Sequence, residues 1–130
     1  MAFALNIGKC SLLGNYRENN EDCVDVKVFP DLIVNIVAGE IASRKAVDII
    51  PRELRKNVTP HLAADGVKTT VRRAIVQANE EIMAMGALDK DMKNMGTTVV
   101  MAAWRKEKGK DHELFVAGVG DSRCYLVRNK

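Results

Sequence analysis

The chain has 130 residues and a formal net charge of +3, with 47% hydrophobic and 28% charged residues. This composition is typical of a folded globular protein and excludes a disordered chain. The length suits one domain, residues 1–130, and the small positive charge alone does not indicate a nucleic-acid partner. The longest apolar run, Val99–Trp104, is far shorter than the roughly 20 residues of a membrane-spanning helix. We therefore expect neither membrane nor nucleic-acid binding.

The amino terminus and the cysteines indicate a compartment. The first residues, M-A-F-A-L-N-I-G-K-C, lack the basic stretch and long apolar core of a signal peptide. Cys10, Cys23 and Cys124 are scattered and form no C-x-x-C pair. We expect them to be small buried hydrophobic side chains in a reducing compartment, which favours a cytoplasmic location.

Two strands are predicted first. Residues 23–29 alternate, with three valines on one side and two charged residues on the other, which is the period of a half-buried strand. Pro30 and Asp31 suit a turn, and the apolar run Leu32–Ala38 predicts a second strand. Together the two segments indicate an antiparallel hairpin.

Two helices are predicted next. From Gly39 onward, apolar residues recur on one face of a 3.6-residue period, and Pro51 should kink or end this helix. A polar loop follows over residues 57–65. Apolar residues over 67–85 then mark the clearest helix of the chain, and Gly86 suits its end.

Further strands are predicted after the helices. Residues 96–104 and 113–119 flank a charged turn over 105–111, and residues 122–128 follow the Gly120-Asp121 turn. This order of strands, helices and strands predicts an α+β fold in which helices cover an antiparallel sheet.

Two segments place acidic residues beside arginine where a strand meets a turn. They are R-E-N-N-E-D, residues 17–22, and G-V-G-D-S-R, residues 118–123. Carboxylate oxygens favour hard cations such as Mg²⁺ or Mn²⁺, and a guanidinium fits phosphate oxygens in a bidentate way. Each segment on its own is more typical of a solvated loop.

Five segments, in the same order, resemble motifs of the metal-dependent protein serine/threonine phosphatases of type 2C. R-E-N-N-E-D is similar to the opening R-x-x-N-E-D of that family. M-G-T-T-V-V at 95–100 resembles its M-G-T-T strand, and V-G-D-S-R-C-Y-L-V-R at 119–128 resembles its G-D-S-R hairpin. G-E-I-A-S-R-K-A-V at 39–47 and R-R-A-I-V-Q-A-N-E-E-I at 72–82 resemble its first two helices.

The resemblance implies an α/β/β/α sandwich, in which two antiparallel sheets pack together and are flanked by helix pairs. It also implies hydrolysis of phosphoserine and phosphothreonine in phosphoprotein substrates by a water that bridges two Mg²⁺ or Mn²⁺ ions. By position, Arg17 would bind the substrate phosphate, Asp22 would be a metal-site carboxylate and Glu21 would bind metal-coordinated water. Asp121 matches the ligand of an additional, more weakly held metal.

These residues also have purely structural interpretations. Arg17 could form a surface ion pair with a neighbouring glutamate, and Asp121 could serve only as a turn residue. His61 and His112 have no acidic or cysteine cluster at ligand spacing, so we assign them no function.

The sequence departs from the family pattern in two places. In the family, the buried strand continues into V-A-D-G-x-G-G, whose Asp and Gly reach both core metals, whereas here Ala38 is followed directly by Gly39. The family's later aspartate ligands also lie beyond Lys130, the last residue given. Two neighbouring cations repel and need several carboxylates between them. We therefore predict a single incomplete phosphatase-like domain that does not hydrolyse phosphoesters by itself.

Two other functional classes stay open. One is a non-catalytic interaction or scaffold module that associates, with itself or a partner, through exposed sheet edges and uncovered apolar faces. The other is a binder of nucleic acid or an anionic surface through Arg105, Lys106, Lys108 and Lys110. A solvated turn is the simpler interpretation of that basic cluster, because Trp104 is the only aromatic residue beside it.

Overall fold

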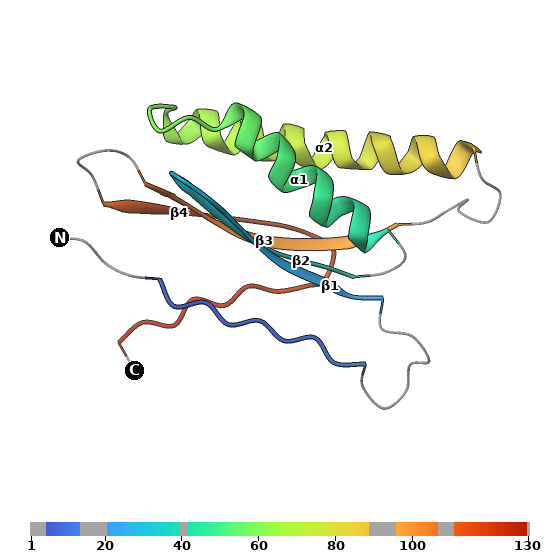
Figure 1. Cartoon of the computed structure of the whole chain (residues 1–130), viewed down its shortest axis with the longest axis horizontal. Helices are drawn as coiled ribbons and strands as arrows, with labels where there is room; N and C mark the ends of the chain where they lie inside the picture. Colours follow the sequence, from blue (N-terminus) through green and yellow to red (C-terminus); the bar gives the residue numbers. More distant parts are fainter. Residues whose placement is uncertain (1–4, 14–20, 40–41, 89–95, 107–110, 130) are drawn as a thin grey trace.

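A four-stranded antiparallel sheet in the order β1-β2-β3-β4 forms the centre of the fold. Helices α1 (Ser43–Asn57) and α2 (Ala64–Leu88) cover one face of it (Figure 1). The strands are β1 (Cys23–Phe29), β2 (Leu32–Gly39), β3 (Thr98–Lys106) and β4 (His112–Val119). The structure, a computed structural model, describes residues 5–13, 21–39, 42–88, 96–106 and 111–129.

The first hairpin confirms the predicted alternation. β1 and β2 pair antiparallel, with Phe29 opposite Leu32 and Cys23 opposite Ala38. Every second residue of β2 is buried beneath the helices, from Leu32 to Ala38. Because partners in register share a face, the three valines of β1 lie on the face away from the helices, and Val28 is 68% exposed.

The helices bury the apolar faces that their periodicity predicts. α1 packs on the sheet, and α2 packs mainly on α1. Pro51 does not end α1, which continues to Asn57. The side chains of Ile50, Pro51 and Leu54 are fully buried. Burial stabilises the fold by about 1.5–3 kcal/mol for each large apolar side chain, and this gain outweighs the loss of the hydrogen bond that proline removes. α2 likewise runs past Gly86. No helix in the described part of the chain is long and apolar enough to cross a bilayer.

A buried arginine joins the sheet to the loop between the helices. Arg105 is only 2% exposed at the helix-facing side of β3. Its guanidinium forms an ion pair with Glu113 of β4 and donates hydrogen bonds to the carbonyl oxygens of Thr59 and Leu62. It also lies 5.6 Å from the ring centroid of Phe115. These contacts anchor the α1–α2 loop to the end of the sheet.

The prediction that Arg105 belongs to a solvated basic turn is therefore wrong. β3 extends to Lys106, and Arg105 continues the alternating series of buried residues on that strand. Lys106 is exposed, while Lys108 and Lys110 lie outside the described residues. Arg105, the first residue of the basic cluster, is therefore buried in the core and cannot contribute to a basic surface.

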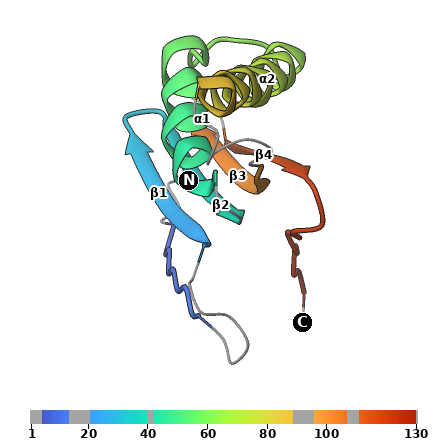
Figure 2. The same ribbon diagram turned by 90° about the vertical axis from the view of Figure 1, so that its right-hand side faces the viewer.

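The second face of the sheet is largely apolar, and no helix of the described residues covers it. Segments 5–13 and 122–129 lie on this side, beneath opposite edges of the sheet (Figures 1 and 2). Alternation and register place the following residues on this face: Val24, Val26, Val28, Ile33, Asn35, Val37, Val100, Ala102, Trp104, Leu114 and Val116.

The strand predicted over residues 122–128 is not formed. These residues have no regular secondary structure, and Tyr125, Leu126 and Val127 are 76%, 65% and 74% exposed. Their strand-like pattern is real, but a strand needs a partner to supply its main-chain hydrogen bonds. No described strand pairs with this segment.

Candidate functional site

Segments from four of the five phosphatase-like motifs meet at one end of the sheet. The register that pairs Gly39 with Thr98 also places Asp22 and Gly120 beside them, one residue beyond the paired ends of β1 and β4. The row is tightly packed, since a Cβ on Gly39 would lie 3.0 Å from Asp22 Oδ1 and 3.2 Å from Thr98 Oγ1. Antiparallel pairing thus gathers residues that are far apart in the sequence.

Hydroxyl groups connect the motifs to one another. Thr98 Oγ1 and Ser122 Oγ lie 3.0 Å apart and link the M-G-T-T strand to the G-D-S-R segment. Thr97 Oγ1 donates a hydrogen bond to the carbonyl oxygen of Gly39. The two threonines therefore do more than fill strand positions: they hold both neighbouring chain segments at this end of the sheet.

The start of α1 is anchored by hydrogen bonds at this end of the sheet. β2 continues through Ala38 and Gly39 in unbroken register, at the point where the family motif has its D-G-x-G-G loop. The amide of Ala42 donates to the carbonyl oxygen of Gly96 at 3.1 Å. The hydroxyl of Ser43 donates to the carbonyl oxygen of Glu21 at 2.6 Å. Strand and helix are thereby tied to the segment that carries Asp22.

The structure places some of the predicted site residues and not others. Glu21 and Asp22 are exposed and immediately precede β1. Asp121 is exposed in the bend that follows β4, so it lies at the same end of the sheet as Asp22. Arg17 lies outside the described residues. The metal and phosphate roles of these residues stay predictions.

An open hollow of about 490 Å³ lies beside Asp22. It holds charges of both signs, because Asp22 and Asp25 share it with Lys9 and Arg44. The hydrogen bond from Lys27 lowers the pKa of Asp25 below its ordinary value, with Lys27 Nζ 3.0 Å from Asp25 Oδ2. The hollow is lined by Lys9, Cys10, Ser11, Asp22, Cys23, Val24, Asp25 and Arg44. An anionic group entering this hollow would meet two cations as well as the carboxylates.

Sequence reasoning missed both cations of this hollow, Lys9 and Arg44, and the sequence carries a signal only for Arg44. The periodicity of α1 places it on the polar face of the helix, with no further role. Arg44 lies in the first turn of α1, which contains no acidic residue. A cation is unfavourable at a helix amino terminus because the helix dipole is positive there. That unfavourable position is the signal in the sequence that could have drawn attention to Arg44.

The cysteines differ from expectation. Cys23 is buried, as predicted, but Cys10 and Cys124 are exposed. All three are free thiols. Cys10 belongs to segment 5–13 and Cys124 to segment 122–129, neither of which joins a described strand. Their burial was predicted from residue type alone, which cannot show whether a segment is covered.

The described residues do not fit a two-metal centre. Within residues 5–13, 21–39, 42–88, 96–106 and 111–129, no three His, Cys, Asp or Glu side chains form a group that could hold a metal ion. Mg²⁺ requires near-octahedral oxygen coordination, and two such ions require shared carboxylates. Asp22 and Asp121 are thus at most part of such a ligand set.

A family model identifies the class of protein to which this fold and its motif-bearing end belong. The family model described as protein phosphatase 2C matches residues 32–130, which is most of the chain. The chain belongs to this family, and the α+β fold predicted from its sequence is confirmed. The R-E-N-N-E-D segment precedes the matched region.

Bacterial relatives support this assignment. The serine/threonine phosphatases stp of Listeria welshimeri serovar 6b and Listeria monocytogenes serovar 1/2a are each 32% identical over 110 residues, which is 85% of this chain. A solved structure of the S. agalactiae serine/threonine phosphatase shares the fold, with a TM-score of 0.61 and 21% identity over 72% of this chain. The chain spans 41% of the length of each of these proteins.

Proposed function

We propose that this chain forms part of a domain that hydrolyses phosphoserine and phosphothreonine in cytoplasmic phosphoproteins with the help of Mg²⁺ or Mn²⁺. The observation that carries the proposal is the convergence of Asp22, Thr98 and Asp121 at one end of the sheet. In the complete domain we assign Asp22 and Asp121 to metal binding, Glu21 to metal-coordinated water and Arg17 to the substrate phosphate. A bound divalent ion would supply hydroxide at neutral pH.

The 130 residues alone are expected to be inactive. Their described carboxylates form no metal centre, and β2 passes directly through the position of the D-G-x-G-G loop. Purified chain with Mn²⁺ and a phosphothreonine peptide should release no phosphate above the rate without protein. Release that Asp22→Ala abolishes would show that these residues suffice for the reaction.

The family activity is tested by completing the domain. The carboxy-terminal part of Listeria monocytogenes stp that this chain does not span is fused after Lys130, with or without a D-G-x-G-G loop inserted between Ala38 and Gly39. We expect Mn²⁺-dependent phosphate release only from the loop-containing fusion, and a loss of at least about 100-fold in its Asp22→Asn variant. A folded loop-containing fusion without activity would refute the proposed function. Equal activity without the loop would refute the need for it.

A second candidate function is self-association through the helix-free face of the sheet. That face is apolar at its centre, and Val28, Val37 and Val116 on it are 68%, 39% and 53% exposed. Two copies of this face are complementary at its apolar centre, because each buries apolar surface of the other. We propose this association as the function of the chain if it serves as a scaffold.

Light scattering over a range of protein concentrations measures this association. The mean mass should rise with concentration for the wild type, and Val116→Lys should return it to that of a monomer, because a buried lysine without a partner is costly. Val76→Lys is the matched control, since Val76 is 54% exposed on α2, away from this face. A constant monomer mass for the wild type would exclude the scaffold function.

A further inference from the structure

A groove of about 280 Å³ runs between α2 and β4, at the opposite edge of the sheet from Asp22. Val71, Met101, Phe115 and Ala117 provide its apolar lining. β4 pairs with β3 on one side, and no other described strand pairs with it on the other. Main-chain N–H and C=O groups on an unpaired edge are available to a further strand. The groove thus combines an apolar wall with a free strand edge.

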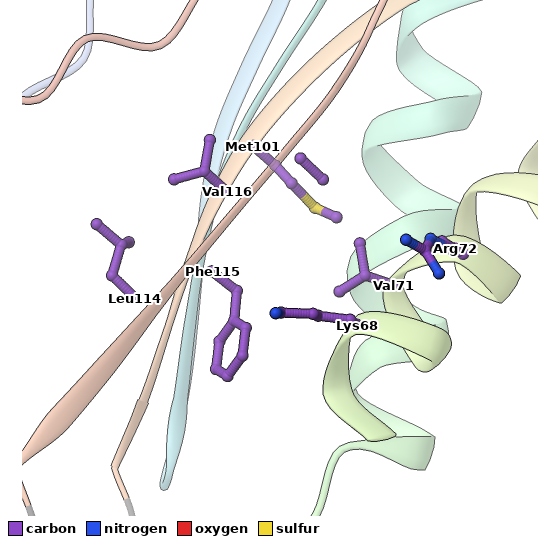
Figure 3. Close-up of a pocket in the computed structure, with 8 residues that line it drawn as sticks. Lys68, Val71, Arg72, Met101, Leu114, Phe115 and Val116 are labelled. Carbon is purple, nitrogen blue, oxygen red and sulfur yellow. The ribbon is translucent and has the colours of Figure 1, made fainter. Parts of the chain in front are cut away.

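The charged side chains that line this groove are all positive. Lys68 and Arg72 lie one turn apart on α2, and Figure 3 shows Lys68 extending across the groove toward Phe115. The one ion-pair partner of Lys68 among the described residues is the 99% exposed Asp65, whose Oδ1 lies 4.0 Å from Lys68 Nζ. Arg72 makes no ion pair with any described residue. Negative charge on an occupant would therefore be attracted to this helix.

On these observations we propose that the groove docks an extended segment of another protein in which acidic and apolar residues alternate. The segment pairs with the free edge of β4, so that main-chain hydrogen bonds supply affinity and alternate side chains supply specificity. Its acidic side chains point toward α2 and contact Lys68 and Arg72. This docking site is separate from the Asp22 end of the sheet and does not depend on the proposed hydrolysis.

The spacing of the two cations fits such a strand. Residues four apart on a helix have Cβ atoms about 6 Å apart. Alternate residues of a strand are about 7 Å apart and point to the same side. Two acidic residues at alternate positions can thus reach Lys68 and Arg72 together. The apolar residues between them point to the other side of the sheet, where Leu114 and Val116 offer an apolar surface.

Fluorescence polarisation with the labelled peptide T-E-V-E-V-E-T and the full chain tests this proposal. We expect saturable binding that weakens at least about tenfold in Arg72→Glu, because the variant replaces an attraction by a repulsion. Arg73→Glu is the matched control: it makes the same charge change at the adjacent exposed residue, which does not line the groove, and it should retain binding. Circular dichroism confirms that both variants fold like the wild type.

Two altered peptides separate charge from strand pairing. T-K-V-K-V-K-T should not bind, because it presents cations to Lys68 and Arg72. Two further versions of the acidic peptide carry methyl groups on alternate main-chain nitrogens, one on the odd and one on the even positions. The version whose methylated nitrogens point toward β4 should bind more weakly than the other. Absence of binding by the acidic peptide, equal binding of both charge types, equal effects of Arg72→Glu and Arg73→Glu, or insensitivity to both methylation phases would each overturn the proposal.

Discussion

Arg105→Met should lower the free energy of unfolding by about 3 kcal/mol. The substitution keeps most of the apolar stem but removes the guanidinium that binds the carbonyl oxygens of Thr59 and Leu62. The half-buried carbonyl of Leu62 loses the guanidinium as its donor, whereas Thr59 O keeps a hydrogen bond from the Leu62 amide. A carbonyl shielded from water and left without a donor costs about 1–3 kcal/mol, and the Glu113 ion pair is lost as well. Because Glu113 is 35% exposed, water can hydrate it, and this limits the loss.

Urea denaturation at neutral pH measures this effect. The variant should unfold at a lower midpoint urea concentration, while the slope of the free energy of unfolding against urea concentration stays unchanged. Lys106→Met is the matched control, because it removes a positive charge from the exposed neighbour on the same strand. It should change stability by less than about 0.5 kcal/mol. If Arg105→Met were no more destabilising than Lys106→Met, the anchoring role of the guanidinium would be incorrect.

Gly120→Ala should destabilise the protein by about 2–4 kcal/mol. Gly120 has φ of 99°, in a region that side-chain-bearing residues rarely adopt. An added Cβ would also lie 2.7 Å from Thr98 Cγ2 and 3.0 Å from Thr98 Cβ. The substitution therefore forces the chain apart where Thr98 meets the bend that carries Asp121.

Gly118→Ala is the matched control for this change. A Cβ at Gly118 would have Val99 O at 3.6 Å as its nearest neighbour, which is an ordinary contact, and its φ is not positive. Alanine in a strand interior is more stable than glycine by roughly 0.5–1 kcal/mol, so this variant should equal or exceed the wild type. Thermal unfolding of the two variants provides the comparison, and equal stabilities would contradict the close approach at Gly120.

The sequence predicts the elements well where a period extends over several residues. The alternation of residues 23–29 gives β1 with its observed bounds, and the long apolar period over residues 67–85 gives most of α2. Local rules fail where packing overrides them. Pro51 is a poor helix residue, yet burial of the residues around it against the sheet keeps α1 intact. Gly86 lies near the end of α2, which continues for only two exposed residues beyond it.

Which side of a strand faces the core cannot be derived from alternation alone. In β1 the helix-facing residues include Asp25 and Lys27, while the valines line the opposite face. Either assignment fits a period of two, and only the register with β2 decides between them. Arg105 was misassigned for a related reason, since a charged residue is buried only when partners distant in the sequence satisfy it.

The motifs of the candidate site are visible in the sequence, but their geometry is not. The sequence indicates residues 17–22, 95–100 and 119–128 separately. Their meeting point depends on the register that places Asp22, Gly39 and Thr98 in one row. Arg44 lines the hollow beside Asp22 from the first turn of α1, where the neighbouring Ser43 donates a hydrogen bond to the carbonyl oxygen of Glu21.

The pairing of β2 with β3 determines how this chain must fold. The side-chain amide of Asn35 donates to the carbonyl oxygen of Ala102, 67 residues away, and both helices lie in the intervening segment. The β1–β2 hairpin, the helix pair and the β3–β4 hairpin each form from neighbours in the chain. Joining the two hairpins instead closes a long loop. The chain loses conformational entropy in this closure before the contacts between the hairpins can compensate for it. From the high contact order of this junction we therefore expect it to be the slow step in the assembly of the sheet.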